Sequence, residues 1–423
     1  MERAIVYKNW KDNAVRYIKW VILGIVTGVV VGIFAAVFAK CLAYATSFRE
    51  AHPYTFMTLP LGGLLIVELY KVAKMEHDKG TDNVIAALQE DIIIPFRLSF
   101  LIFVSTVITI FCGGSVGREG AALQIGSSLG NTVSRVLRFK PENRKVLIMS
   151  GMAAAFSALF HTPVAAAFFA MEVSSVGMLR YAALVPCILA SVTAYEISGY
   201  FDIEGEHFAT EAAMQVSMHL SIKILILAMG CALLSMFFCV MLQTAEKIMH
   251  KYVPNRYIRV LIGSTILIVL NLVVGTNDYQ GTGMQVIERA VEGEAQVWAF
   301  LLKLIFTVVT IAAGFKGGEI VPSFFIGATF GCVMAGMLGM PLTLGASIGM
   351  VCVFCGVTNC PIASLLISIE LFGTSNILYF LMAIATSYAL SGYVSLYHTQ
   401  VILFAKNEEK MIERKVGHIW NEK

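Results

Sequence analysis

The stretch CGGSVGREGAALQIGSSLG, residues 112–130, places Arg118 and Glu119 side by side in a glycine-rich break. Apolar sequence lies on both sides of this break. Ionisable side chains inside a membrane are energetically costly, and where they occur they mark ion pathways, proton relays or buried ion pairs. The first question is therefore why two charged residues lie between two apolar segments that could span a membrane.

The composition is that of an integral membrane protein. Of 423 residues, 57% are hydrophobic and 14% are charged, whereas soluble domains carry about 25% charged residues. A membrane-spanning helix needs about 20 mostly apolar residues. Apolar runs near this length occur at 18–42, 56–73, 92–113, 181–198, 220–242, 257–275, 297–313 and 375–394. The sequence thus predicts an all-α, polytopic membrane protein whose main surroundings are the lipid bilayer.

The charges outside these runs predict the orientation. Residues 1–19, the loop 134–145 and the tail after Ala405 each hold five basic residues, while 201–213 holds four acids and no Lys or Arg. By the positive-inside rule, both termini and the loop 134–145 are expected in the cytoplasm and 201–213 outside, in a plasma-membrane protein. A net charge of +3 without a basic stripe argues against a nucleic-acid partner.

The chain contains an internal repeat. Residues 106–130 match residues 307–331 at an offset of 201, and residues 162–173 match 360–371 at an offset of 198. The second block aligns Pro163 with Pro361 and Glu172 with Glu370. We therefore expect one transmembrane domain over 1–423, with a first repeat over about 15–198, a second over about 215–405, and a short cytoplasmic tail, 406–423.

The two glycine breaks predict an anion site. Unwound backbone survives inside a membrane only where protein or a water-filled cavity satisfies it. A helix that restarts at such a break offers free N–H groups and the positive end of its dipole. Helix-compatible sequence follows both breaks, so two half-helices could direct their N-termini at one point. The later glycines Gly126, Gly130, Gly327 and Gly331 are instead expected to allow close helix packing.

Glu119 and Glu319 adjoin the two breaks and are the candidates for gating and proton transfer. An ionised carboxylate competes with an anion for the site, whereas a protonated one donates a hydrogen bond and carries a proton. The alternative is a structural ion pair, of Glu119 with Arg118 or of Glu319 with Lys316. Arg118 and Lys316 are expected to hold the loops and set the local field.

Other polar residues have less specific interpretations. The symmetric placement of Glu172 and Glu370 favours a helix-end hydrogen bond, with a proton relay as the alternative. Tyr397 follows the last apolar run and could turn its hydroxyl inward as a donor, but its position alone favours an interfacial aromatic anchor. Three cysteines have a spacing that resembles a metal site, but no His or acid lies near them, so small buried hydrophobes are expected: Cys352, Cys355 and Cys360. No metal or cofactor is predicted.

At these residues the sequence resembles the CLC family of anion channels and proton-coupled antiporters, over nearly the whole chain. GREGA at Gly117–Ala121 is similar to the family's GREGP, and GGEIVP at Gly317–Pro322 occupies the place of its GxFxP element. GTDNV at Gly80–Val84 falls on its GSGIP element. The resemblance implies a bundle of tilted and partial helices in two repeats of inverted topology, and a homodimer with a separate pore in each subunit.

GFKGGEIVP, residues 314–322, looks like the GFKGGEVTP element of the fluoride/proton antiporters in this family. Glu319 stands where chloride-type members have an apolar residue, and the cytoplasmic proton glutamate of the chloride exchangers would fall on Val173. Val321 departs from the branch, which usually has Thr there. The resemblance implies gating by Glu119 and proton transfer by Glu119 and Glu319, with anion-binding positions at Gly117, Arg118, Gly120, Ile320, Val321, Tyr397 and Thr81.

Fluoride suits a site rich in donors, because it is small, strongly hydrated and the best hydrogen-bond acceptor among the halides. The expected activity is fluoride export in exchange for protons. A chloride/proton antiporter or chloride channel of the same family is the alternative, and it would need Glu119 but not Glu319. An enzyme is not expected, because the apolar segments hold no HExxH motif and no convincing Ser/His pair.

Overall fold

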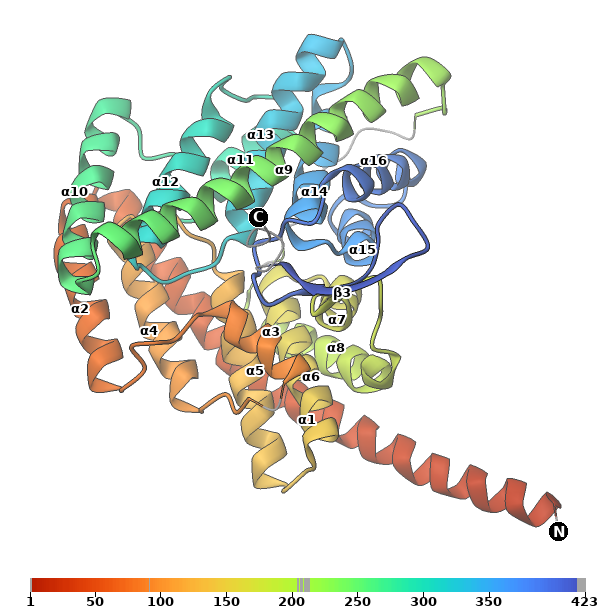
Figure 1. Cartoon of the computed structure of the whole chain (residues 1–423). Coiled ribbons are helices and arrows are strands. Elements are labelled where there is room, and N and C mark those ends of the chain that lie inside the picture. Colours follow the sequence, from red (N-terminus) through yellow and green to blue (C-terminus); the bar gives the residue numbers. More distant parts are fainter. Residues whose placement is uncertain (1, 91, 204, 206–207, 209–213, 417–423) are drawn as a thin grey trace.

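The computed structural model describes residues 2–90, 92–203, 205, 208 and 214–416, and side chains from residue 12 onward. The described part is almost entirely helical, and the N-terminal part of α1 projects away from the other helices (Figure 1). Its helices are α1 (Glu2–Ala51), α2 (Leu59–Val72), α3 (Thr81–Gln89), α4 (Arg97–Phe111), α5 (Glu119–Val136), α6 (Pro141–Phe160), α7 (Pro163–Glu172), α8 (Leu184–Tyr200), α9 (Met218–Tyr252), α10 (Arg256–Val274), α11 (Met284–Val291), α12 (Ala299–Ala313), α13 (Ile320–Leu338), α14 (Leu342–Thr358), α15 (Pro361–Phe372) and α16 (Ile377–Leu390). Two 3₁₀ helices, Thr55–Thr58 and Tyr181–Ala183, precede α2 and α8.

Not every expected run forms a full-length span. Within the described residues, six helices are long and apolar enough to cross a membrane: Asp12–Ala51, Thr55–Val72, Tyr181–Tyr200, Met218–Tyr252, Arg256–Val274 and Ile320–Leu338. The runs at 92–113, 297–313 and 375–394 instead give α4, α12 and α16, with 15, 15 and 14 residues. At 1.5 Å per residue these are about 22 Å long, less than the roughly 30 Å hydrocarbon core. The acidic stretch 201–213 lies largely outside the described residues.

The late glycines of α5 and α13 bring helices into backbone contact, as the sequence predicts. A Cβ at Gly126 or Gly130 would overlap the carbonyl oxygen of Gly151 or Leu147 in α6. A Cβ at Gly327 or Gly331 would overlap carbonyl oxygens in α14 in the same way. Because no side chain fits between these backbones, α5 is fixed on α6 and α13 is fixed on α14.

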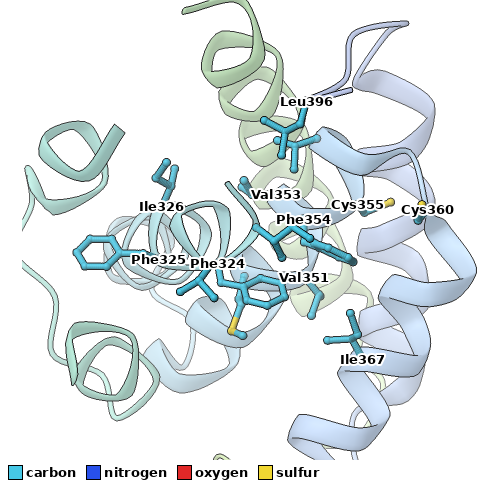
Figure 2. Packing of buried hydrophobic residues seen from close by; sticks show 14 of the residues in the cluster. Phe324, Phe325, Ile326, Val351, Val353, Phe354, Cys355, Cys360, Ile367 and Leu396 are labelled. Atoms are coloured by element: carbon cyan, nitrogen blue, oxygen red, sulfur yellow. The ribbon is translucent and has the colours of Figure 1, made fainter. Parts of the chain in front are cut away.

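Aromatic packing fixes the first turn of α13. Figure 2 shows Phe324 and Phe354 side by side, with Phe325 on the opposite side of α13. The ring centroids of Phe324 and Phe354 are 5.1 Å apart, and the ring of Phe160 in α6 lies 5.7 Å from that of Phe324. These rings are buried, so a dense apolar cluster fixes α13 at Phe324.

Glu172 and Glu370 each bind the N-terminus of a helix in the other half of the chain. Glu172 ends α7 and accepts hydrogen bonds from the N–H groups of Ile362 (3.2 Å) and Ala363 (2.9 Å) in the first turn of α15. Glu370, in α15, accepts from Val164 (2.9 Å) and Ala165 (2.8 Å) in the first turn of α7. The predicted helix-end hydrogen bonds are confirmed, and they are reciprocal.

We expect Glu172→Ala to lower the free energy of unfolding by about 2 kcal/mol. The change removes a charged acceptor from two N–H groups at a buried helix start, where caps contribute ~0.5–2 kcal/mol and hydrogen bonds to charged groups ~1.5–3 kcal/mol. A lowered thermal unfolding midpoint in detergent would be the readout. Glu172→Gln keeps an acceptor oxygen and should recover part of the loss. A Glu172→Gln variant with normal stability but altered proton movement would instead support the relay alternative.

A small sheet and three basic side chains gather at the end of α3. The strand β1 (Ser175–Val176) pairs in parallel with β2 (Val401–Phe404), which pairs antiparallel with β3 (Met411–Lys415). Lys145 and Arg180 donate to the carbonyl oxygens of Gln89 (2.7 Å) and Leu88 (2.8 Å), and Lys415 binds Glu90 (2.6 Å). Cations suit the C-terminal end of a helix dipole. Lys145, at the end of the basic loop 134–145, and Lys415 therefore lie on one face of the protein.

Candidate functional site

The two glycine breaks meet each other. The N–H of Gly117 donates to the carbonyl of Gly318 (2.6 Å), and the N–H of Gly318 donates to the carbonyl of Gly117 (2.8 Å). This short antiparallel bridge lies directly before α5 and α13, so the positive ends of both helices are brought to one place. A Cβ on Gly120 would lie 2.7 Å from the Cα of Gly318, which explains why this position is glycine.

Each break is supported by a threonine of the other half. Thr310, near the end of α12, accepts a hydrogen bond from the N–H of Ser115 (3.2 Å). Thr109, near the end of α4, accepts one from the N–H of Lys316 (3.3 Å). The glycine that follows each helix has a positive φ, +84° at Gly113 and +105° at Gly314. These exchanged contacts hold irregular backbone in the interior without exposing unpaired N–H groups.

The Glu119 side chain lies at the bridge and is completely buried. Its Oε2 accepts from the N–H of Arg118 (3.0 Å), and the N–H of Val321 also acts on this carboxylate. Its Oε1 lies 3.4 Å from Nε of Arg118 but has no hydrogen-bond partner among the described residues. The carboxylate thus occupies a place served by the N-termini of both α5 and α13, and the ion pair considered from the sequence also forms.

Glu319 lies close to Gly120, directly before the first residue of α13. A Cβ on Gly120 would lie 3.5 Å from Oε2 of Glu319 and 3.4 Å from Oγ1 of Thr81, so these two groups face the same glycine. Thr81 begins α3, a third helix whose N-terminus points to this region. The alternative of a Glu319–Lys316 ion pair is not supported, because the carboxylate paired with Lys316 is that of Asp78, at 4.0 Å, and Lys316 acts on Glu319 only through its field.

Tyr397 is an interior residue rather than an interfacial anchor. Its side chain is only 2% exposed, and its hydroxyl has no hydrogen-bond partner within the described part of the chain. Both Glu319 and Glu119 act on it electrostatically. Asp82 fixes the segment by accepting hydrogen bonds from the N–H and hydroxyl of Thr399, both at 3.0 Å. An unpartnered buried hydroxyl is a donor available to a bound acceptor.

A cavity of about 710 Å³ leads to this region, and we call it the vestibule. Its wall is formed by the loop 76–80, the ends of α9 and α10, the segment 313–317 and residues 396–399. Thr81, Glu319 and Tyr397 are among its lining residues. The remaining site residues are buried and are not among the lining residues: Gly117, Glu119, Gly120, Ile320 and Val321. The expected site residues are thus grouped around the bridge, with Arg118 on its far side, donating to the carbonyl of Leu159 (3.3 Å).

The vestibule also carries charged residues that the sequence analysis missed. Glu246 lies near the end of α9, which extends ten residues past the expected apolar run 220–242, and Arg259 lies one turn into α10. Glu246 and Asp82 both act electrostatically on Glu319. Glu246 and Arg259 could have been found as charged residues within or just beyond an apolar run, which is how Glu119 was found.

The arrangement can stabilise a small anion and exchange protons beside it. Backbone N–H groups at helix starts, a free tyrosine hydroxyl and two carboxyl groups surround one spot, and a carboxyl group can switch between acceptor and donor. No group of three or more His, Cys, Asp or Glu side chains in the described residues could hold a metal ion. Cys352, Cys355 and Cys360 are buried, as small apolar residues would be. These features define a membrane protein with an internal ion pathway.

The comparisons identify the family. The voltage gated chloride channel family matches residues 61–392, so the chain belongs to this family of ion-transport proteins, which are not enzymes. It is 30% identical over 402 residues to the chloride/fluoride channel protein of Pseudomonas syringae pv. tomato, covering 93% of this chain and 89% of that relative. It also resembles an uncharacterized protein of Methanocaldococcus jannaschii, at 25% identity over 86% of this chain and 91% of the relative.

Solved structures have the same fold. A crystal structure of a CLC-type fluoride/proton antiporter superimposes with a TM-score of 0.88 and 33% sequence identity, over 91% of this chain and 98% of that chain. A slow cyanobacterial Cl⁻/H⁺ antiporter gives a TM-score of 0.78 at 17% identity, over 88% and 94% of the two chains, and shows the fold alone. The protein is therefore a multi-pass membrane protein with the CLC fold.

Proposed function

We propose that this protein exports fluoride from the cytoplasm in exchange for protons. The observation that carries the proposal is the pair of carboxyl groups at the bridge, with Glu119 fully buried beside Gly117 and Glu319 lining the vestibule. A chloride pathway has no evident need for the second carboxyl group. The similarity to a chloride/fluoride channel protein and to a fluoride/proton antiporter supports the same choice of ion.

The proposed roles follow from what each group can donate. Fluoride keeps its water tightly, so removing that water requires strong donors in its place. The protonated Glu319, the hydroxyl of Tyr397 and the N–H groups at Ile320 and Val321 would supply them. Ionised Glu119 would occupy the anion-binding position itself. Protonated Glu119 would leave this position free for the anion. Gly117 and Gly120 let the backbones approach, Thr81 contributes the start of α3, and Arg118 acts through its charge.

The proposal includes the architecture and the orientation. The chain would be one domain of two repeats with inverted topology, about 15–198 and 215–405, followed by the tail 406–423. Support comes from the contacts exchanged between the halves. Thr109 and Thr310 each accept a hydrogen bond from the glycine break of the other half, and Glu172 and Glu370 each accept from a helix start in the other half. Both termini would be cytoplasmic in the plasma membrane, and the shared face of Lys145 and Lys415 supports this. We also propose a homodimer with one pore in each subunit.

The decisive experiment is ion flux from liposomes that contain the purified protein. Fluoride and chloride efflux would be followed with selective electrodes while the pH is recorded. We expect fluoride efflux with matched proton movement and little chloride efflux. Liposomes without protein, treated identically, give the background leak. Chloride efflux equal to or greater than fluoride efflux would contradict the proposal and favour a chloride transporter.

Val321 is the residue that tests the choice between fluoride and chloride. It stands in the first turn of α13, fully buried, where a threonine would add a hydroxyl near the Glu119 carboxylate. We expect Val321→Thr to raise fluoride over chloride selectivity by several-fold, about the effect of one additional hydrogen bond of ~1 kcal/mol. Parallel efflux traces for the two ions measure it. An unchanged ratio would mean that this side chain does not face the ion.

A further inference from the structure

Arg259 has an unusual position among the cations of the vestibule. It lies in the first turn of α10 and its side chain is only 5% exposed, yet it lines the cavity. Its Nε and Nη1 atoms have no hydrogen-bond partner among the described residues. Buried polar groups are nearly always hydrogen-bonded, and a buried guanidinium without partners is costly. Its vacant donors therefore need an explanation.

The neighbouring cations differ in this respect. Arg256, one turn before Arg259, forms an ion pair with Glu76 at 2.8 Å. Lys316, across the vestibule, lies 4.0 Å from Asp78 and over the ring of Tyr70. Glu246 acts on Arg259 electrostatically, but it is not among the ion-pair partners found within 4.0 Å in the described part of the chain. Arg259 is thus a buried cation of the vestibule that has no carboxylate within 4.0 Å among the described residues.

The position of Arg259 suits an anion on its way to the bridge. The start of α10 is capped by Asn255, whose side chain accepts from the N–H groups of Tyr257 (3.0 Å) and Ile258 (3.4 Å). The positive end of α10 and the Arg259 guanidinium thus both lie at the wall of the cavity that Glu319 and Tyr397 also line. A guanidinium stays charged and gives charge-assisted hydrogen bonds to anions.

We propose that Arg259 is a capture site for a small hydrated halide, fluoride in the proposed function, in the vestibule before the bridge. The site would hold the ion beside the Arg259 guanidinium, which lines the cavity, and raise its local concentration next to Glu319 and Tyr397. This inference rests on the proposed function only for the identity of the ion. It assigns to Arg259 a binding role that is separate from gating.

The test is the fluoride concentration that gives half-maximal efflux from liposomes. We expect Arg259→Gln to raise this concentration about tenfold, the loss of one charge-assisted hydrogen bond, while the maximal rate stays within about twofold. Arg256→Gln is the matched control, since it removes an equivalent charge one turn away whose partner is Glu76, and it should leave the value unchanged. An unchanged value in Arg259→Gln, or a fall in maximal rate alone, would overturn the inference.

A second variant works in the opposite direction and does not depend on Arg259→Gln folding. Glu246→Gln removes the negative charge that acts on Arg259, so the half-maximal fluoride concentration should fall about threefold, as expected for a screened interaction across several ångströms. A rise or no change would count against the capture site. The wild-type protein in the same liposomes separates the two proposals. If the wild-type protein moves no fluoride, the proposed function fails. If it moves fluoride but Arg259→Gln leaves the half-maximal fluoride concentration unchanged, only the capture site fails.

Discussion

In liposomes, Glu119→Gln is expected to reduce the proton movement that accompanies fluoride by at least about 100-fold. Proton transfer by a positioned side chain typically contributes ~10²–10⁴-fold to a rate, and glutamine cannot ionise. The amide would remain in the buried place near the N–H groups of Arg118 and Val321, but without a charge it could not exchange with an anion. The measurement is the rate of external pH change driven by an outward fluoride gradient.

The same substitution at a distant carboxyl residue serves as the control for Glu119→Gln. Glu196 is an exposed carboxyl residue on α8, and Glu196→Gln should leave coupled proton movement at the wild-type rate. Glu119→Gln should also keep its thermal unfolding midpoint, because glutamine has nearly the same volume and still accepts a hydrogen bond. Proton movement at the wild-type rate in a folded Glu119→Gln protein would show that Glu119 is not the gate.

Glu319→Gln is expected to separate fluoride binding from proton coupling. The glutamine amide still offers an N–H donor beside Gly120, so fluoride affinity should stay within about threefold of wild type. Coupled proton movement should nevertheless be lost, because the side chain can no longer release a proton toward the vestibule. Fluoride binding to the purified protein by calorimetry, together with the liposome pH trace, measures the two effects separately.

Two further variants make this result specific. Glu319→Ala removes the donor as well, and fluoride affinity should fall about tenfold. Glu76→Gln changes a carboxyl group at the wall of the same vestibule, paired with Arg256, and should retain coupling. If Glu319→Gln keeps full proton coupling, Glu319 has only a structural role and the choice of fluoride over chloride loses its main support.

The sequence predicts the centre of the site better than its surroundings. The repeated glycine breaks and the carboxyl residues beside them were sufficient to expect that α5 and α13 start at one point, as the Gly117–Gly318 bridge shows. The spacing of Gly126 and Gly130 likewise predicts close helix packing. These features depend on local backbone requirements, which leave a direct trace in the residue types.

The vestibule could not be predicted in the same way. Arg259, Glu246 and Asp78 come from three separate segments, and only the tertiary structure brings them to one cavity. The carboxylate partner of Lys316 could not be found either, because sequence proximity suggests only Glu319, whereas the loop before α3 places Asp78 within 4.0 Å. The burial of Tyr397 could not be predicted from its position alone for a related reason. Its burial depends on Asp82 holding Thr399, a contact between residues 317 positions apart.

The exchanged carboxyl groups of α7 and α15 have a consequence for how the chain is made. The acceptor for the first turn of α7 is Glu370, 206 residues later than Val164. At ribosomal rates of about 5–20 residues per second, this partner arrives roughly 10–40 s after α7 itself. During that interval the start of α7 must rely on water, lipid headgroups or an insertion factor, whereas α15 finds Glu172 already in place. Biogenesis is therefore asymmetric even though the finished contacts are symmetric, and the first half of the nascent protein is the part most exposed to membrane quality control.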